Sequence, residues 1–129
     1  MLLSALITDI GDARLARPHA SGDVAVAGLS ANSKDVRAGF VFAALPGLKT
    51  DGRVFIADAV KNGAVAVVAP AGADVPGGIA VIESADPRRI FARMAARFSG
   101  AQVRQTVAVT GTNGKSSTVN FCRQMWEHM

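Results

Sequence analysis

The feature that most constrains this 129-residue sequence is a glycine-rich turn near its C-terminal end. An apolar, β-branched run leads into the sequence Gly111-Thr112-Asn113-Gly114-Lys115-Ser116-Ser117. The run predicts a strand over Thr106 to Thr110, and the residues from Lys115 to Met129 predict a helix. A strand, a glycine turn and a helix N-terminus direct several backbone N–H groups at one spot, beside a lysine and a hydroxyl. The sequence therefore predicts a loop that binds a polyphosphate with its magnesium ion.

Composition and charge narrow the classes of protein to which the chain can belong. Half of the residues are apolar, so a hydrophobic core can form, but no apolar stretch is long enough to span a bilayer. The net charge is +4, the arginines are dispersed, and there is no tyrosine and one tryptophan, which argues against a nucleic-acid surface. The single cysteine, Cys122, allows no internal disulfide and fits a reducing cytoplasm. We predict no membrane insertion, no nucleic-acid partner and no obligate protein partner.

The sequence before the turn alternates between strand and helix patterns. A helix opens at Asp51-Gly52 and stops at Asn62-Gly63, with apolar residues at three- and four-residue spacing between them. Met1 to Leu6 is interpreted as a helix or an anchor on the core, since it lacks the basic start of a signal peptide. Strands are predicted at 24–30, 40–44, 64–68 and 78–82. Strand, helix, strand is a βαβ unit, which predicts a small α/β domain.

A second helix is predicted where Asp86-Pro87 provides an N-cap and a proline in the first turn. Its arginines at positions 89, 93 and 97 are interpreted as a solvated face, and a phosphate-binding row is the alternative. We expect two parts, a domain over residues 1–84 and the start of a second domain over residues 85–129. The helical pattern continues to Met129 without a cap, which predicts that the second domain is truncated.

Two parts of the sequence resemble the Mur ligases, the cytoplasmic ATP-dependent enzymes that extend the peptidoglycan stem peptide. The turn is similar to the family's G-T-N-G-K-T-T, with serine at positions 116 and 117. Ser30 to Ala44 resembles the family segment D-S-R-x-V-x-x-G-x-L-F-x-A, and Pro46 to Ile56 resembles its continuation G-x-x-x-D-G-x-x-F-I. Asn32 and Lys34 replace the family's usual Asp and Arg. The similarity covers nearly everything from residue 29 onward.

The resemblance implies a small N-terminal UDP-binding α/β domain, followed by the first strand, phosphate loop and helix of a P-loop ATPase domain. By position, Ala31, Ser33 and the loop Leu48-Lys49-Thr50 would bind the uridine diphosphate end of UDP-N-acetylmuramoyl dipeptide. A hydroxyl after a strand and a loop before a helix make a polar pocket that suits an anionic, planar ligand. On the residues alone, Ser33 and Asn32 would only form a turn, and Asp51 would only cap a helix.

The resemblance also assigns roles within the turn. The residues that would bind ATP are Gly111, Thr112, Asn113, Gly114, Lys115, Ser116 and Ser117. Lys115 would be the catalytic residue that neutralises the β and γ phosphates, and Ser116 would ligate Mg2+. Thr112 is expected to face the interior of the loop.

The implied reaction is the formation of an amide. ATP phosphorylates the D-glutamyl carboxylate of UDP-N-acetylmuramoyl-L-alanyl-D-glutamate, and the amine of a diamino acid attacks the acyl phosphate. The G-T-N-G-K form of the turn favours the ligase that adds the third amino acid, meso-diaminopimelate, although no residue here distinguishes it from lysine. The alternatives are the fourth-step ligase that adds D-alanyl-D-alanine, a non-catalytic UDP-sugar-binding module and an unrelated P-loop ATPase. For the 129 residues alone we predict binding of the UDP moiety without ligase activity.

Overall fold

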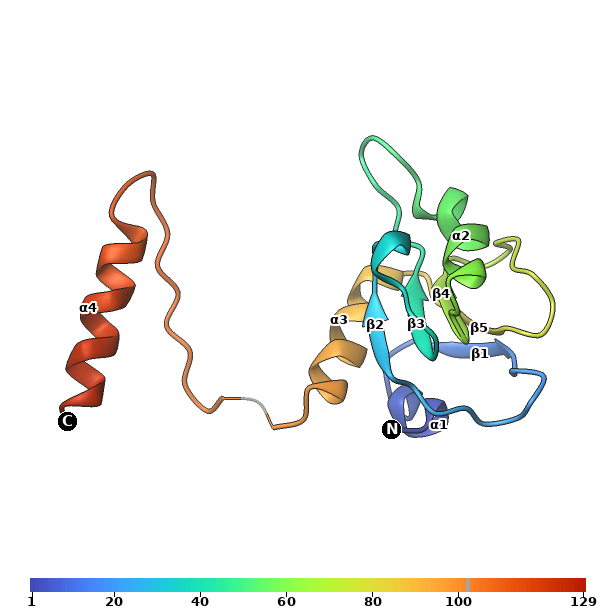
Figure 1. Cartoon of the computed structure of the whole chain (residues 1–129), viewed down its shortest axis with the longest axis horizontal. Coiled ribbons are helices and arrows are strands. Elements are labelled where there is room, and N and C mark those ends of the chain that lie inside the picture. The colour runs from blue at the N-terminus through green and yellow to red at the C-terminus, as the bar shows by residue number, and fades with distance from the viewer. Residues whose placement is uncertain (102) are drawn as a thin grey trace.

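The computed structural model describes residues 1–101 and 103–129 and consists of two parts (Figure 1). The first part is an α/β body that holds the strands and all helices up to α3 (Pro87–Phe98). The second part is an extended segment followed by α4 (Lys115–Glu127), which stands apart from the body along the long axis of Figure 1. The predicted α/β class is confirmed.

The described residues of the body form a five-stranded sheet in the order β1-β5-β4-β3-β2. The four strands from β2 to β5 are parallel, and β1 pairs with β5 in the antiparallel sense at one edge. The strands are β1 (Arg14–Arg17), β2 (Gly28–Ser30), β3 (Phe40–Ala43), β4 (Ala66–Ala69) and β5 (Ala80–Glu83). The predicted strands are therefore confirmed with shifted ends, and the one expected over 24–30 is shorter, because only its last three residues pair with β3.

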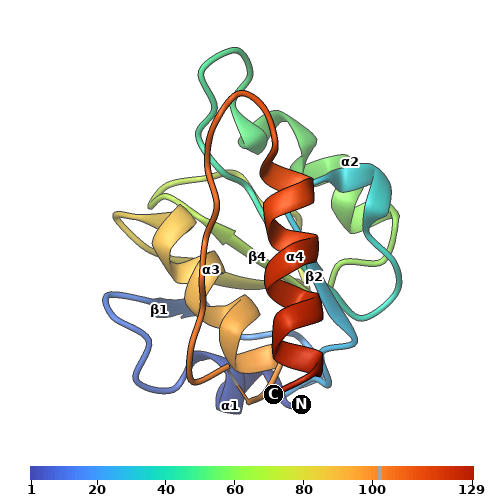
Figure 2. The same ribbon diagram turned by 90° about the vertical axis from the view of Figure 1, so that its left-hand side faces the viewer.

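Helices cover both faces of the sheet, with α3 and α2 (Ile56–Lys61) on opposite sides of the strands (Figure 2). On one face lie α1 (Leu3–Ile7), which confirms the expected helix at the start of the chain, and α3. On the other face lies α2, with the short 3-10 turns η1 (Ser33–Asp35) and η2 (Gly52–Phe55). Alternate residues of β3 point to the two faces, as strand geometry requires. All four residues of β4 are buried, as expected for a strand covered on both sides.

Packing assigns α3 to the body. Its predicted start is confirmed, because the Asp86 side chain accepts a hydrogen bond from the Arg89 N–H. Ile90 and Met94 are fully buried in the core formed with the sheet and α1. The Arg97 guanidinium donates to backbone carbonyls at the end of α1, so the interpretation of the arginine row as only solvated is wrong for Arg97. The division expected between residues 84 and 85 stays a prediction, and the packing favours a boundary after α3.

The strand expected over Thr106 to Thr110 is absent from the described structure. A strand needs a neighbour to accept and donate its backbone hydrogen bonds, and these residues lie beside no strand of the sheet. The helix expected after the glycine turn is confirmed and begins at Lys115. No helix among the described residues is both long enough and apolar enough to cross a membrane.

Candidate functional site

The candidate uridine site lies where the parallel strands end. Ligands of open α/β sheets bind outside the carboxyl ends of the parallel strands, because the connections that follow them meet there. The end of β2 leads into η1, and the end of β3 leads into the loop at residues 46–51, which projects from the body at the top of Figure 1. Since β2 and β3 are neighbours, the fold brings the predicted residue Ser33 and the predicted loop Leu48-Lys49-Thr50 to the same edge of the sheet.

The turn η1 is held by hydrogen bonds on both sides of Ser33. The Asn32 side chain accepts from the Lys34 N–H at 3.1 Å and donates to an Asp35 carboxylate oxygen at 2.9 Å. Asn32 thus caps η1. Ser33 is buried, with 7% of its surface exposed, and its backbone carbonyl accepts from the Asn62 side chain at 2.8 Å. The expected turn is confirmed, while ligand contact by Ser33 and by the exposed Ala31 stays a prediction.

The loop at residues 46–51 is closed at its base and open at its tip. The Gly52 N–H donates to the Leu45 carbonyl at 2.9 Å, which joins the two ends of the loop. From α3, the Arg88 guanidinium donates to the Pro46 carbonyl at 3.0 Å. Leu48, Lys49 and Thr50 at the tip are all exposed. The tip is therefore free to contact a ligand while its base is anchored to the sheet and to α3.

Asp51 has the capping role that its sequence position suggested. One carboxylate oxygen accepts from the Arg53 N–H at 2.9 Å, and the other pairs with the Arg53 guanidinium at 2.6 Å. These bonds from Arg53 hold the pKa of the Asp51 carboxyl below its ordinary value and raise the pKa of Arg53. The Asp51 carboxylate is thus engaged within η2.

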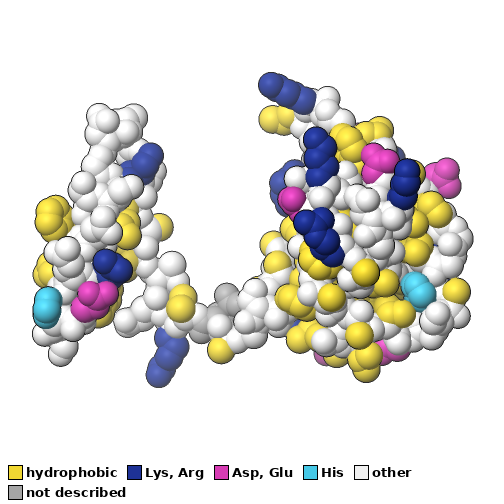
Figure 3. Space-filling view, in the orientation of Figure 1, with side chains coloured by type: hydrophobic (Ala, Val, Ile, Leu, Met, Phe, Trp, Pro, Cys, Tyr) yellow, Lys and Arg dark blue, Asp and Glu magenta, His cyan; other side chains and the backbone are white. Residues whose placement is uncertain are grey.

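Basic side chains lie at this end of the body, with acidic side chains between them (Figure 3). Lys34 lies in η1, Lys49 in the projecting loop and Arg53 in η2, and all three are exposed. Arg53 is paired with Asp51, so Lys34 and Lys49 carry the positive charge at this edge that would attract an anionic ligand such as a diphosphate.

The phosphate loop has the backbone of a helix N-terminus that is ready for an anion. Gly111 has a φ of 148° and Gly114 a φ of 75°, values in the region that favours glycine. Gly114 is the N-cap of α4 and provides no side-chain acceptor, and the first turn holds no acidic residue. The first backbone N–H groups of α4 are therefore not matched by a capping side chain, and a phosphate group fits there chemically.

The predicted ATP residues share this loop but not the surroundings expected for them. Gly111, Thr112, Asn113, Gly114, Lys115, Ser116 and Ser117 are all exposed. The expected orientation of Thr112 toward the interior of the loop stays a prediction, because exposure alone does not show where its side chain points. The phosphate loop also lies on the second part of the molecule, well separated from η1 and the projecting loop (Figure 1). The structure does not bring the two sets of predicted residues together.

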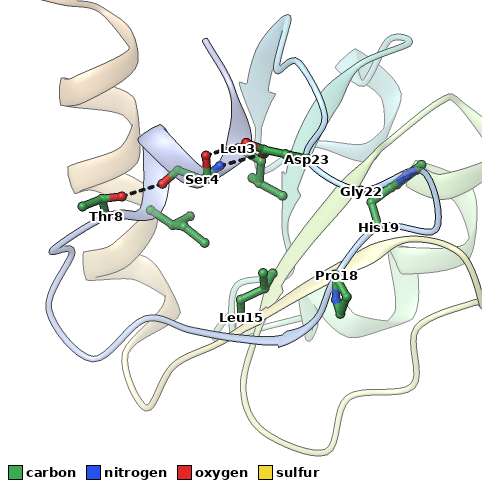
Figure 4. Close-up of a pocket in the computed structure, with 9 residues that line it drawn as sticks. Leu3, Ser4, Thr8, Leu15, Pro18, His19, Gly22 and Asp23 are labelled. Carbon is green, nitrogen blue, oxygen red and sulfur yellow. Dashed lines mark hydrogen bonds between the residues drawn. The ribbon is translucent and has the colours of Figure 1, made fainter.

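A third feature lies at the other end of the body and was not predicted. A groove of about 440 Å3 runs between α1 and the turn at residues 18–23 (Figure 4). At its rim, the Asp23 carboxylate accepts from the Ser4 hydroxyl at 2.5 Å and from the Ser4 N–H at 3.0 Å. These bonds lower the pKa of Asp23 and fix the start of α1. The residues that line the groove are Leu3, Ser4, Ile7, Thr8, Leu15, Pro18, His19, Gly22 and Asp23, none of which is a predicted site residue.

A mostly parallel α/β sheet, followed by a glycine turn at the N-terminus of a helix, is an arrangement typical of nucleotide-binding α/β proteins. The sequence pattern of the Mur ligase family catalytic domain matches residues 25–114 of the chain. The chain therefore belongs to the Mur ligase family, and the resemblance seen in its motifs is confirmed.

Curated relatives make the similarity more specific. The chain is 50% identical over 110 residues to the UDP-N-acetylmuramoyl-L-alanyl-D-glutamate–2,6-diaminopimelate ligase of Caulobacter vibrioides, covering 85% of this chain and 22% of that protein. It is 42% identical over 127 residues to the ligase of the same name from Rhizobium meliloti, covering 95% of this chain and 26% of that protein. The chain thus spans about a quarter of the length of these relatives.

Solved structures of the family share the fold. The crystal structure of MurF ligase from Thermotoga maritima in complex with ADP superposes with a TM-score of 0.55 at 33% identity, covering 70% of this chain and 21% of that one. The structure of UDP-N-acetylmuramoylalanyl-D-glutamyl-2,6-diaminopimelate–D-alanyl-D-alanyl ligase from Acinetobacter baumannii gives a TM-score of 0.56 at 28% identity, covering 72% and 21%.

Two residues that support the candidate site were missed by the sequence analysis. The sequence indicated Asn62 only as a helix stop and gave Arg88 no role, yet each donates to the backbone of a predicted site segment. These contacts join residues that are 29 and 42 positions apart. The spacing of residues within one helix or strand does not predict contacts between such distant positions, so these two contacts could be identified only from the fold.

Proposed function

We propose that this chain serves an ATP-dependent amide ligase of cytoplasmic peptidoglycan precursor synthesis. In this proposal the enzyme adds meso-diaminopimelate to UDP-N-acetylmuramoyl-L-alanyl-D-glutamate. The observation that carries the proposal is the identity of 42–50% to relatives that bear this name. Because the chain spans about a quarter of those relatives, we assign to it one part of the task, which is to hold the UDP end of the substrate.

In the proposed complex, the substrate lies at the carboxyl edge of β2 and β3. Ser33 and Ala31 contact the uridine or its phosphates, and Leu48, Lys49 and Thr50 close over the uracil ring. Three observations support this placement: the buried hydroxyl-bearing residue in η1, the exposed tip of the projecting loop and the basic rim. The apolar Leu48 side chain is fully exposed, and packing over a planar base would remove this side chain from water.

The phosphate loop is assigned to ATP and its magnesium ion. The backbone of Gly111, Asn113 and Gly114 faces the phosphates, Lys115 supplies the positive charge, and Ser116 supplies the hydroxyl ligand to Mg2+. When bound, ATP provides the phosphoryl group that activates a carboxylate toward an amine. The uncapped N-terminus of α4 supports this assignment, because a helix N-terminus without acidic residues attracts anions.

One solved neighbour is named as a D-alanyl-D-alanyl ligase, which makes addition of D-alanyl-D-alanine the second candidate. The identity of the solved neighbours to this chain is 28–33%, whereas the diaminopimelate ligases reach 42–50%. The higher identity favours addition of the third amino acid.

Isothermal titration calorimetry of the 129-residue chain tests the proposal. We expect UDP-N-acetylmuramoyl-L-alanyl-D-glutamate and UDP to bind, Ser33→Ala to weaken that binding, and the remote Ser21→Ala to leave it unchanged. We expect MgATP to give no measurable heat and a mixture of all substrates to give no amide. Binding of MgATP without any response to either uridine ligand would instead identify an unrelated P-loop ATPase.

A further inference from the structure

The backbone of η1 has one support that comes from a distant part of the chain. The Ser33 carbonyl accepts from the Asn62 side-chain amide at 2.8 Å, in a partly buried hydrogen bond that spans 29 positions. Within η1 itself, the same carbonyl accepts only the long bond from the Val36 N–H at 3.4 Å. Of the two hydrogen bonds that orient the Ser33 carbonyl, the one from the Asn62 side-chain amide is therefore the shorter.

The end of α2 is itself fixed against the segment that follows η1, so Asn62 is a rigid support. Asn62 is the C-cap of α2, and its N–H donates to the Asp58 carbonyl at 2.9 Å. The next residue, Gly63, has a φ of 108° and approaches so closely that a Cβ atom there would lie 2.7 Å from the Ala38 Cα. The Gly63 carbonyl also accepts from the Gly39 N–H at 3.0 Å. The helix end and the segment 37–39 are therefore locked together beside η1.

We propose that Asn62 is a positioning residue for the proposed uridine diphosphate site and acts through the backbone of Ser33. This inference rests on the proposed function of Ser33. Asn62 belongs to neither hydrophobic core cluster and is exposed as a residue, so its side chain is not required to fill the core. Its described contact to another element is made to the segment that carries the ligand-binding hydroxyl. Fixing that backbone before the ligand arrives lowers the ordering cost of binding.

The variant Asn62→Leu keeps the approximate size and neutrality of the side chain but removes its N–H donors. Loss of one neutral hydrogen bond corresponds to a factor of about 2 to 13 in an equilibrium constant. Because UDP must then order the η1 backbone that Asn62 no longer holds, we expect the Kd for UDP to rise about 3- to 10-fold. Asn62→Gln retains a donating carboxamide and is expected to recover part of the affinity. The matched control is Asn120→Leu on the exposed surface of α4, which is expected to leave the Kd unchanged.

A second control separates positioning from general stability. Ser4→Ala removes the hydroxyl bond to Asp23 at the opposite end of the body, and it is expected to lower the melting temperature without changing the Kd for UDP. All Kd values are measured by calorimetry at a temperature where circular dichroism shows each variant to be folded. A purely structural Asn62 would behave like Ser4, with a lower melting temperature and an unchanged Kd, and that result would overturn the inference.

One measurement needs no variant and covers the case in which Asn62→Leu does not fold. In the NMR spectrum of the wild-type chain, the two side-chain amide protons of Asn62 are expected to shift with the Ser33 backbone amide as UDP is added. A shift of the Ser33 backbone amide signal without any shift of the Asn62 side-chain signals would contradict the inference. If wild-type protein binds no uridine ligand at all, the proposed function itself fails, which is a different outcome from equal binding by wild type and Asn62→Leu.

Discussion

Replacing Gly52 with alanine tests whether the base of the projecting loop is as tightly closed as the structure indicates. Gly52 begins η2, and its N–H donates to the Leu45 carbonyl at 2.9 Å. A Cβ atom at position 52 would lie 2.6 Å from the Leu45 nitrogen, 2.7 Å from the Leu45 oxygen and 2.9 Å from the Ala44 carbonyl carbon. All three are backbone atoms at the end of β3, where Ala43 and Ala44 are fully buried, so they cannot rotate out of the way.

The cost follows from these distances. Overpacking costs about 1–3 kcal/mol, and the strained Gly52–Leu45 hydrogen bond adds about 1 kcal/mol. The φ of Gly52 lies outside the left-handed region, so alanine recovers about 0.5 kcal/mol by restricting the unfolded chain. The net loss in the free energy of unfolding is about 1.5–3.5 kcal/mol. For a body of about 100 residues, whose entropy of unfolding is about 0.21 kcal/mol/K, this lowers the melting temperature by roughly 7–17 °C.

The assay compares thermal unfolding by circular dichroism with UDP binding by calorimetry. The control is Gly77→Ala, at a glycine that also avoids the left-handed region and has no atom within 4 Å of an added Cβ. We expect Gly77→Ala to melt within a few degrees of wild type and to bind UDP normally. Gly52→Ala is expected to melt far lower and, at temperatures where it is folded, to bind UDP more weakly. Equal melting temperatures for the two variants would refute the steric reasoning.

Two further variants test other contacts. Arg88→Met removes the hydrogen bond to the Pro46 carbonyl, so calorimetry should show UDP affinity about 2- to 5-fold weaker with little change in melting temperature; an unchanged Kd would show that the loop does not depend on α3. The Asp12 carboxylate accepts from the Ala85 N–H and the Ser84 hydroxyl, which keep its folded-state pKa below the ordinary 3.8. Its stabilising effect is therefore complete above that value and is lost as pH falls through the lower, folded-state pKa. The melting temperature of the wild type should therefore fall more in acid than that of Asp12→Asn. Parallel profiles of melting temperature against pH for the two proteins would contradict this.

The middle of the fold could be read from the sequence because its signals are local. The capping carboxylate of Asp51, the apolar spacing of α2 and the stop at Asn62-Gly63 lie within a dozen residues of one another, and the uniformly apolar β4 follows directly. Each of these elements is specified by its own residues, so the βαβ prediction is confirmed with only small shifts in its ends.

The edge strand β1 could not be read in the same way. Its residues Arg14–Arg17 alternate poorly and are largely exposed, and they become a strand because they pair with β5. The Arg14–Glu83 ion pair, at 2.8 Å, joins the same two strands. The opposite error concerns Thr106 to Thr110, where a good β pattern forms no strand because no partner lies beside it. Strand formation depends on pairing, which local propensity does not contain.

The two candidate sites differ in what supports them, and this difference determines which ligand the chain is expected to hold. Ser33 is buried within η1, whose backbone is fixed by Asn32 on one side and by Asn62 on the other. Lys115 is exposed at the first turn of a helix that stands apart from the body, after a segment without sheet partners. A ligand that binds the first site meets groups already in place, whereas a nucleotide at the second must order the loop and the preceding segment as it binds. Since ordering costs are subtracted from affinity, UDP is the ligand we expect the chain to bind by itself.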